Sequence, residues 1–388
     1  MPLPFVCSPA DLLAVVPYQL GFYPRASVVI VCLDAADRVV GMIRIDTGPL
    51  PPPPGSAEVA AVAALLRRQA GGLVILGFEE AQGSSDAVRC WLARLAADGG
   101  VAVVAHLVVR DGRWWDVECV DPTCCPAPGR PVPPPARVSV VAEWVGRGVA
   151  PLADRAAVAR QLDSGPRAAE VAVALSRQRS PYQARAHSSA HPGDRPPDGD
   201  GAAAPAWEAI LDPGGRHPPV RALPAHLLAA AALALQGTEH RDAVICWLAP
   251  DLVPPDLAPP DRGCSPLSRM LGEPPWAQRH GTRDATTVIG PASTAARSGY
   301  PLPTATAPVD MPAQVLRCQH RLIDLVACLP RDEQVVALSV LASFAWWRGD
   351  GPLAAVALER AVTIDPGDSL SGVLLRMVRL GVRPWATG

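Results

Sequence analysis

The segment ASVVIVCL, Ala26–Leu33, decides the fold. It is an almost uninterrupted run of apolar residues, many of them β-branched, as expected of a strand that is covered on both faces. Other segments have the same character, and the pair Asp111-Gly112 predicts a hairpin turn between two of them. We expect further strands over Arg38–Asp46, Gly72–Phe78, Val101–Arg110 and Arg113–Cys119.

Helical segments separate several of these strands. Ser8 and Pro9 are residue types that begin helices, and Pro17 and Gly21 predict the end of that first helix. The alternation of strand and helix predicts an α/β domain with a mixed sheet. Two more helices are expected in this domain, over about 56–69 and from Ser84 or Ser85 to about Asp98.

The sequence predicts a division into two domains. The α/β domain covers residues 1–175 and carries a Cys-rich loop at 119–129; two helices, over Ser139–Val149 and Pro151–Leu162, follow that loop. Residues 176–206 are poor in apolar side chains and predict a disordered linker. Residues 207–388 predict an all-α domain, interrupted at about 250–312 by a Pro-rich irregular insertion.

The C-terminal tail has the most regular helical pattern. It predicts four helices and, over Val335–Asp368, resembles a tetratricopeptide repeat, a helical hairpin whose small residues let two helices approach closely. Simple helix packing without a repeat array explains the same pattern. The four helices are expected over Gln314–Cys328, Glu333–Arg348, Pro352–Ile364 and Ser369–Leu380.

Several segments together resemble the family catalogued as domain of unknown function 4192, found mainly in actinobacteria. The resemblance covers nearly the whole chain and implies a bacterial cytoplasmic protein of this α/β-plus-helical layout. It implies no activity and transfers no catalytic residue. The segments that carry it are Leu12–Ser27 (LLAVVPYQLGFYPRAS), Arg44–Asp46, Cys119–Gly129 (CVDPTCCPAPG), Arg241–Ala243 and Ala357–Pro366 (ALERAVTIDP).

Composition excludes several classes of function. The 388 residues carry a formal net charge of -2, which gives no bulk reason to bind nucleic acid or an anionic membrane. All 35 basic residues are arginine, so a Schiff-base lysine and a P-loop lysine are excluded. The start lacks the features of a secretory signal, and no apolar run is long enough for a membrane helix. We expect a soluble cytoplasmic protein whose cysteines are thiols.

Cys119, Cys124 and Cys125 form the one cluster of potential metal ligands that stands out. Three thiolates can hold Zn²⁺, with a fourth ligand from a histidine such as His106 or His217. Against this, adjacent cysteines point in different directions in an extended chain. Redox chemistry and burial as small apolar residues are the alternatives that remain open.

Two functional hypotheses remain. Standard nucleotide-binding and hydrolase motifs are missing from the sequence, so a non-catalytic protein-interaction or regulatory protein is favoured, with its partner bound by the helical domain. The alternative is an enzyme or a small-molecule or metal-binding protein with its site in the α/β domain. Arg44 and Asp46 share one face of a predicted strand and mark a possible polar site there, or else an ion pair at a sheet edge.

Overall fold

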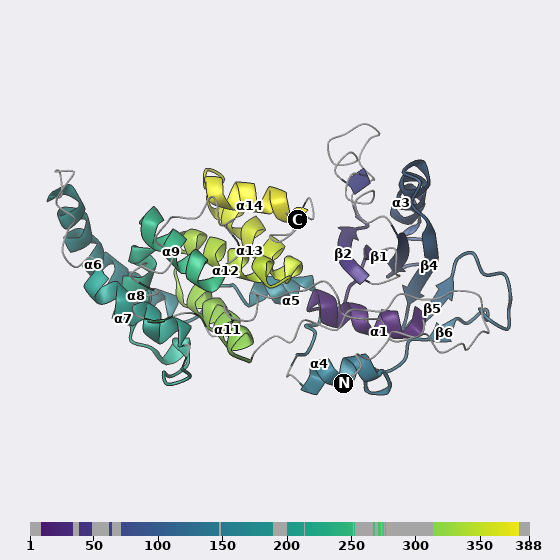
Figure 1. Ribbon diagram of the computed structural model, residues 1–388, viewed down its shortest axis with the longest axis horizontal. Coiled ribbons are helices and arrows are strands. Elements are labelled where there is room, and N and C mark those ends of the chain that lie inside the picture. Colours follow the sequence, from purple (N-terminus) through teal and green to yellow (C-terminus); the bar gives the residue numbers. More distant parts are fainter. Residues whose placement is uncertain are drawn as a thin grey trace. The chain divides into compact units, whose positions relative to one another are not determined.

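The computed structural model divides the protein into two compact units (Figure 1). Among the described residues the boundary lies between Arg155 and Ala156. The first unit contains the strands and the second is helical, so the predicted combination of an α/β part and an all-α part is confirmed. The described residues are 9–33, 39–48, 62–63, 71–146, 149–188, 200–212, 214–250, 252, 267, 271–272, 274, 276 and 313–379.

The described part of the α/β unit contains a six-stranded mixed sheet with the order β2-β1-β3-β4-β5-β6. Strands β3 and β4 pair in parallel and are connected by helix α3, Asp86–Asp98, whereas the other neighbours are antiparallel. The predicted helix at about 56–69 falls almost entirely outside the described residues. The strands are β1 Ser27–Leu33, β2 Val39–Asp46, β3 Gly72–Phe78, β4 Val103–Arg110, β5 Arg113–Asp116 and β6 Arg130–Pro131.

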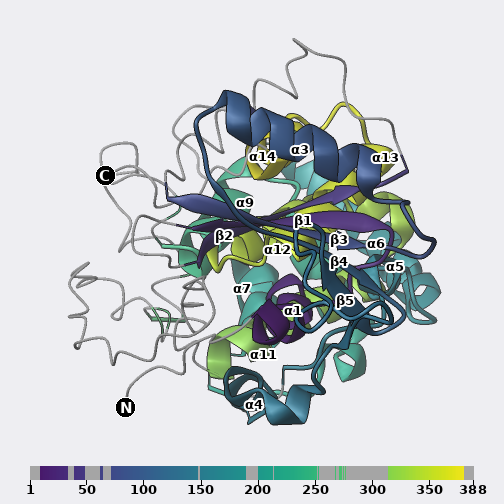
Figure 2. The same cartoon turned by 90° about the vertical axis from the view of Figure 1, so that its right-hand side faces the viewer.

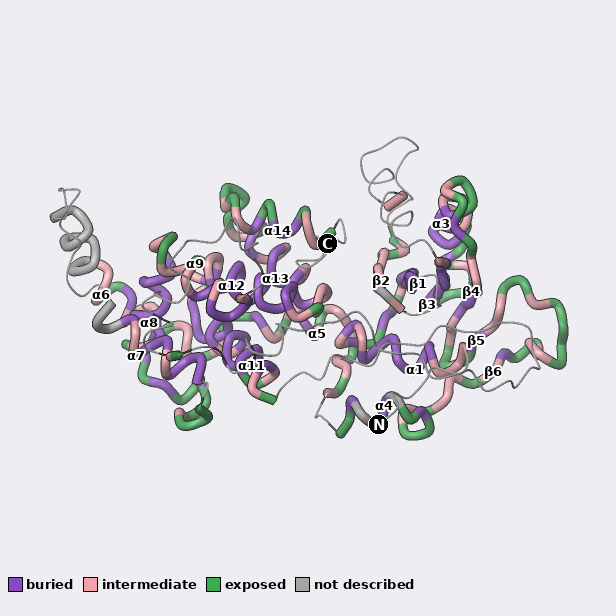
Figure 3. Tube along the Cα trace, in the orientation of Figure 1, coloured by how far each residue is buried: buried purple, intermediate pink, exposed green. Residues whose placement is uncertain are grey.

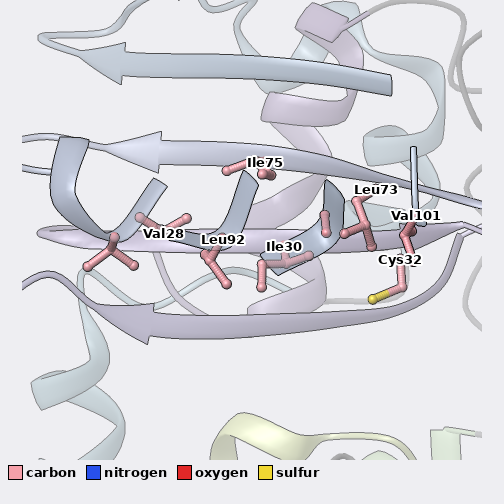
Figure 4. Packing of buried hydrophobic residues seen from close by; sticks show 9 residues of the cluster. Val28, Ile30, Cys32, Leu73, Ile75, Leu92 and Val101 are labelled. Carbon is pink, nitrogen blue, oxygen red and sulfur yellow. The ribbon is translucent and has the colours of Figure 1, made fainter. Parts of the chain in front are cut away.

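Helices cover both faces of this sheet. Figure 2 shows α3 on one face, and α1, Pro9–Leu20, with α4, Ser139–Gly146, on the other. Every residue of β1 and of β3 is buried, as the apolar run at Ala26–Leu33 predicted. Under α3 the apolar side chains of the sheet and helix form one cluster (Figure 4), made of Val28, Ile30, Cys32, Leu73, Ile75, Val88, Leu92, Ala96 and Val101.

The first helix ends at Leu20, directly before the predicted terminator Gly21, and runs through the other predicted terminator, Pro17. Pro17 lies inside α1 rather than at its end, and the helix continues to Leu20. A proline inside a helix removes one backbone hydrogen bond. Nearly every residue from Leu12 to Leu20 is buried, so packing offsets that loss. Gly21, with φ of +76°, ends the helix because it adopts the left-handed conformation.

The hairpin between β4 and β5 has the turn that the sequence predicted. Asp111 and Gly112 have φ of +51° and +70°, the signs that a two-residue turn of the twisted hairpin type requires. Strand β5 then ends at Asp116, earlier than the predicted end at Cys119. Residues 117–129 therefore leave the sheet as a loop that returns to it at β6.

The helical unit is built around helix α12, Val335–Trp347, which is almost entirely buried (Figure 3). A helix that is apolar all round needs partners on every side. Helices α9, α11, α13 and α14 supply them, and all four predicted tail helices are confirmed. Their likeness to a tetratricopeptide array stays a prediction. The helices around α12 are α9 Thr238–Leu248, α11 Ala313–Cys328, α13 Gly351–Ile364 and α14 Ser369–Arg379.

Helices also occupy segments for which the sequence predicted a linker. Helix α6, Ala168–Ser188, and helix α7, Asp200–Leu211, cover much of 176–206, and 189–199 lie outside the described residues. Val171 and Leu175 of α6 are buried, and their burial anchors this helix in the helical unit. The boundary between the units lies at 155/156, earlier than the predicted 175/176. The remaining helices are α5 Arg155–Arg160 and α8 Ala225–Ala234, with short 3₁₀ turns η1 Pro135–Arg137, η2 Val220–Ala222 and η5 Arg331–Glu333.

The predicted Pro-rich insertion at about 250–312 lies almost wholly outside the described residues. Three of its described residues, Leu267, Pro274 and Trp276, are buried, and Trp276 is the aromatic one. Its indole N–H donates to the carbonyl of Leu248 at 3.0 Å, and its ring lies 5.4 Å from that of Trp247 and 5.9 Å from that of Phe344. The insertion therefore contributes at least one aromatic side chain to the core.

Candidate functional site

The loop between β5 and β6 brings the three predicted metal-binding cysteines together. The Sγ atoms of Cys119, Cys124 and Cys125 all lie within 4.8 Å of one another, and each residue is half-buried. Adjacent cysteines point in different directions only where the chain is extended. Here the chain turns at 122–124, so the side chains of the adjacent cysteines meet Cys119 instead of diverging.

Local hydrogen bonds produce this turn. The amide of Cys125 donates to the carbonyl of Asp121 at 2.7 Å, and the amide of Thr123 donates to Asp121 Oδ1 at 2.8 Å. A short aspartate side chain that accepts from the backbone two residues on is a recurrent turn device. The hydrogen bond from Thr123 also lowers the pKa of the Asp121 carboxyl group.

The other end of the loop is held against β5. Trp115 Nε1 donates to the carbonyl of Ala127 at 3.3 Å, and Arg113 NH1 donates to that of Gly129 at 2.9 Å. Gly129 has φ of +73°, and a Cβ there would lie 2.6 Å from the Trp115 ring. Only glycine satisfies both the backbone conformation and this close approach.

The thiol of Cys125 is not set up as a nucleophile. Burial raises the pKa of Cys125 to about 11, and a smaller part of that rise comes from the neighbouring Cys119 and Cys124, because a second negative charge is unfavourable there. A reactive thiol needs a lowered pKa, so the redox alternative is not favoured at Cys125. Metal binding would deprotonate the three thiols, because the metal ion takes the place of the protons on sulfur.

Neither histidine considered as a fourth ligand belongs to the thiol group. His106 lies in β4, and its Nε2 is 2.7 Å from NH1 of Arg89. His217 lies in the helical unit, where its amide donates to Asp212 Oδ1. The part of the chain that the structure describes thus offers three donors at this position and no fourth.

A buried ion network lies at the carboxyl ends of the parallel strands β3 and β4. Glu79 accepts hydrogen bonds from the amides of Gly83 and Ser85, from Ser85 Oγ at 2.7 Å and from Arg110 NH1 at 3.0 Å. Burial pushes the pKa of Glu79 upward, but the hydrogen bonds from Ser85 and Gly83 outweigh it and lower the pKa. The amides that precede α3 are thus occupied by the protein's own carboxylate.

This network was not predicted from the sequence. Glu79 and Glu80 both follow β3 directly, but Glu79 is buried and Glu80 is exposed. Arg89 of α3 completes the network with contacts to Ser85 Oγ, Asp86 and His106. The available signal was the position of Glu79 directly after a buried strand, where α/β proteins place polar side chains.

Arg44 and Asp46 form an ion pair, which is one of the two interpretations that their spacing allowed. Their charged groups lie 2.6 Å apart on β2, the edge strand of the described sheet. Arg44 also donates to the carbonyl of Arg25 at 3.4 Å and lies over the ring of Phe22. These contacts join β2 to the segment that precedes β1, and a ligand site at this edge stays a prediction.

The helical unit contains a pocket that the sequence did not predict. Its volume is about 480 Å³, and it lies where α6, the turn between α8 and α9, the start of α12 and the turn between α13 and α14 meet. Arg241 and Asp365 belong to two segments that carry the family resemblance, but nothing in the sequence shows that these segments meet. The lining residues are Arg179, Leu235, Gln236, Arg241, Asp332, Glu333, Val335, Val336, Ile364, Asp365 and Asp368.

The charges around this pocket are unevenly matched. Arg179 pairs with Glu333 at 2.7 Å, and Arg241 pairs at 2.8 Å with Asp242, which is not a lining residue. Asp365 and Asp368 accept hydrogen bonds from the amides of Gly367 and Ser371, both at 2.9 Å. No described arginine or histidine forms an ion pair with Asp332, Asp365 or Asp368, so the pocket carries an excess of carboxylates.

One family model matches residues 9–253 and 313–385, which is most of the chain. The chain belongs to this family, Domain of unknown function (DUF4192). The DUF4192 match omits 254–312, the segment whose composition indicates an insertion. No curated protein and no solved structure matches the chain. Among the described residues of this DUF4192 protein, no helix combines the length and the apolar character that crossing a membrane requires.

Proposed function

We propose that this protein is a non-catalytic interaction or regulatory protein whose helical unit binds a partner at the pocket lined by Asp332, Asp365 and Asp368. The partner supplies a cationic side chain on an apolar stem, as a lysine or arginine of a peptide does. The tetratricopeptide likeness of α12 and α13 is part of this proposal, since helical hairpins of that kind commonly bind peptides.

The excess of carboxylates is the observation that carries the proposal. Four lining residues are acidic and two are arginines, and one of these arginines is already paired outside the pocket. Like charges that surround a concave surface create a potential that attracts the opposite charge. A basic group entering the pocket finds three aspartates without a cationic partner.

The apolar part of the lining supports the choice of a lysine or arginine. Leu235, Val335, Val336 and Ile364 lie beside the charged groups, and Leu235 is buried. Lysine and arginine bury their methylene stems along apolar surface while the charged head stays among polar groups. A volume of about 480 Å³ lies within the range of pockets that hold ligands of drug size.

The competing hypothesis, an enzyme or small-molecule-binding protein with its site in the α/β unit, receives less support. Its natural place is the carboxyl ends of β3 and β4. There Glu79, Ser85 and Arg89 are buried and bond to one another, so these three side chains are engaged by the protein itself. We also propose a cytoplasmic location, which is the one that the family resemblance implies.

The test measures the affinity of the full chain for short lysine-bearing peptides by fluorescence anisotropy. Asp332→Asn and Asp365→Asn each remove one charge without changing the size of the side chain. Each is expected to weaken binding about fivefold, the effect of roughly 1 kcal/mol. Glu239→Gln is the matched control, because Glu239 is an exposed acid of α9 that does not line the pocket. Equal affinities for all four proteins would contradict the proposal.

A further inference from the structure

We infer that Cys119, Cys124 and Cys125 form a binding site for a thiophilic metal ion of the zinc class. This inference is independent of the proposed peptide pocket, which lies in the other unit. It rests on the convergence of three sulfur atoms from two positions of one loop, all within 4.8 Å of one another.

The spacing of the sulfur atoms is close to what a metal requires. With Zn–S bonds of about 2.3 Å and tetrahedral angles, bound sulfur atoms lie about 3.8 Å apart. The Sγ atoms start within 4.8 Å of one another, so rotations of the side chains bring them to that distance without a change in the turn. The hydrogen bond from the Cys125 amide to the Asp121 carbonyl fixes the backbone in this arrangement.

Apart from the hydrogen bonds already described, the loop has little apolar packing near Cys119 to hold its shape. Val120 is 96% exposed and Val117 48% exposed, so the apolar side chains near Cys119 point to solvent rather than into a core. The loop also contains no helix or strand between β5 and β6 (Figure 3 shows it largely exposed). Small structures without a sufficient core are commonly stabilised by a metal ion.

The donor set identifies the class of metal. Thiolates are soft ligands that select zinc and similar ions, and they do not suit Mg²⁺ or Ca²⁺. The described residues supply three donors, so one position of a tetrahedral ion stays open for water or for a ligand from another molecule. Binding converts three thiols to thiolates, so one divalent ion enters, three protons leave, and the complex carries one negative charge.

The experiment uses the full chain, reduced and freed of metal by a chelator, and titrates it with Co²⁺ as a spectroscopic substitute for Zn²⁺. We expect one equivalent to bind with a sulfur-to-cobalt absorption band in the near ultraviolet. Cys119→Ser, Cys124→Ser and Cys125→Ser should each weaken binding about tenfold or more. Cys90→Ser is the matched control, because Cys90 is an exposed thiol on α3 that is not part of the group, and it should bind as the unchanged protein does.

A second measurement uses only the unchanged protein, so its result does not depend on whether the variants fold. Zn²⁺ should slow alkylation of Cys119, Cys124 and Cys125, identified by mass spectrometry, and leave Cys90 equally reactive; a chelator should restore the original rates. The inference is overturned if Co²⁺ gives no sulfur band, or if Zn²⁺ leaves the alkylation of all three cysteines unchanged. It is also overturned if the three serine variants bind Co²⁺ as tightly as the unchanged protein.

Discussion

NH1 of Arg89 lies 2.7 Å from Nε2 of His106 in the interior of the α/β unit. A guanidinium group can only donate hydrogen bonds, so Nε2 of His106 must accept. The imidazole is therefore neutral and carries its proton on Nδ1. Burial lowers the pKa of His106 to about 4, and the charge of Arg89 adds to this effect against the opposing influence of Asp116 and Asp86.

This contact predicts a loss of stability in acid. In the unfolded chain His106 has an ordinary pKa of about 6.5, so below that pH the unfolded state binds a proton that the folded state does not. The contribution of neutral His106 to the free energy of unfolding is fully present above pH 6.5. It falls by about 3 kcal/mol as the pH is lowered from 6.5 towards 4. Urea unfolding of the unchanged protein and of His106→Gln at several pH values measures it. The variant should show a shallower decline over this range; parallel curves would contradict the assignment.

Gly77 predicts a steric effect in the same region. A Cβ at this position of β3 would overlap Ser85 Oγ and lie 2.5 Å from Cδ of Arg89. Gly77→Ala should therefore destabilise the protein by about 2 kcal/mol or more, because the two side chains cannot both keep their bonds. Gly48→Ala is the control, since a Cβ there meets nothing within 4 Å, and its effect should stay within about 0.5 kcal/mol. Thermal unfolding of the two variants gives the comparison.

Gly129 tests how the Cys-rich loop is held. Alanine there would adopt a left-handed conformation and place its Cβ 2.6 Å from the ring of Trp115. We expect a loss of about 2 kcal/mol, part from the backbone and part from displacement of the ring. Gly100→Ala has a similar φ of +68° with nothing within 4 Å, so it should show only the backbone part, about 1 kcal/mol. Equal losses for the two variants in chemical unfolding would mean that the ring does not pack on Gly129.

Gln334 connects three parts of the helical unit. Its amide nitrogen donates to the carbonyls of Leu162 at 3.0 Å and Val326 at 2.8 Å, and its oxygen accepts from Nε of Arg360. Gln334 is completely buried, so Gln334→Ala leaves these groups without partners. The variant should lose about 3 kcal/mol in free energy of unfolding, several times the loss of Gln178→Ala, whose exposed amide makes one bond to the carbonyl of His226. Denaturant unfolding followed by circular dichroism is the measurement, and similar losses would contradict the role of Gln334.

Much of the fold could be predicted because its elements carry strong local signals. The apolar runs at β1, β3 and β4 and the Asp111-Gly112 turn leave few alternatives to strands and a hairpin. The tail helices were found within a few residues of their ends, since α11 and α14 have clear apolar faces. Local pattern failed at α6, where the buried Val171 and Leu175 anchor the first half of a helix whose second half, SRQRSPYQARAHS, is largely polar.

The sites were less predictable because they depend on contacts between distant segments. The cysteine spacing marked a possible cluster, and its metal binding stays a prediction; the turn that brings Cys124 and Cys125 to Cys119 depends on the Asp121 carbonyl and side chain. Glu79 and Arg110 are far apart in sequence and lie 3.0 Å apart only because β3 and β4 are parallel neighbours. Arg241 and Asp365 line the same pocket only because of tertiary packing, which no local sequence pattern indicates.

Reversal of charge tests the proposed function most directly. The affinities of the unchanged protein and of a variant with both Asp332→Arg and Asp365→Arg are measured for two peptides that differ only in carrying lysine or glutamate. Because the pocket holds three aspartates without a cationic partner, the unchanged protein should prefer the lysine peptide and the variant the glutamate peptide. If both proteins show the same preference, the pocket does not bind the partner and the account of the helical unit is wrong.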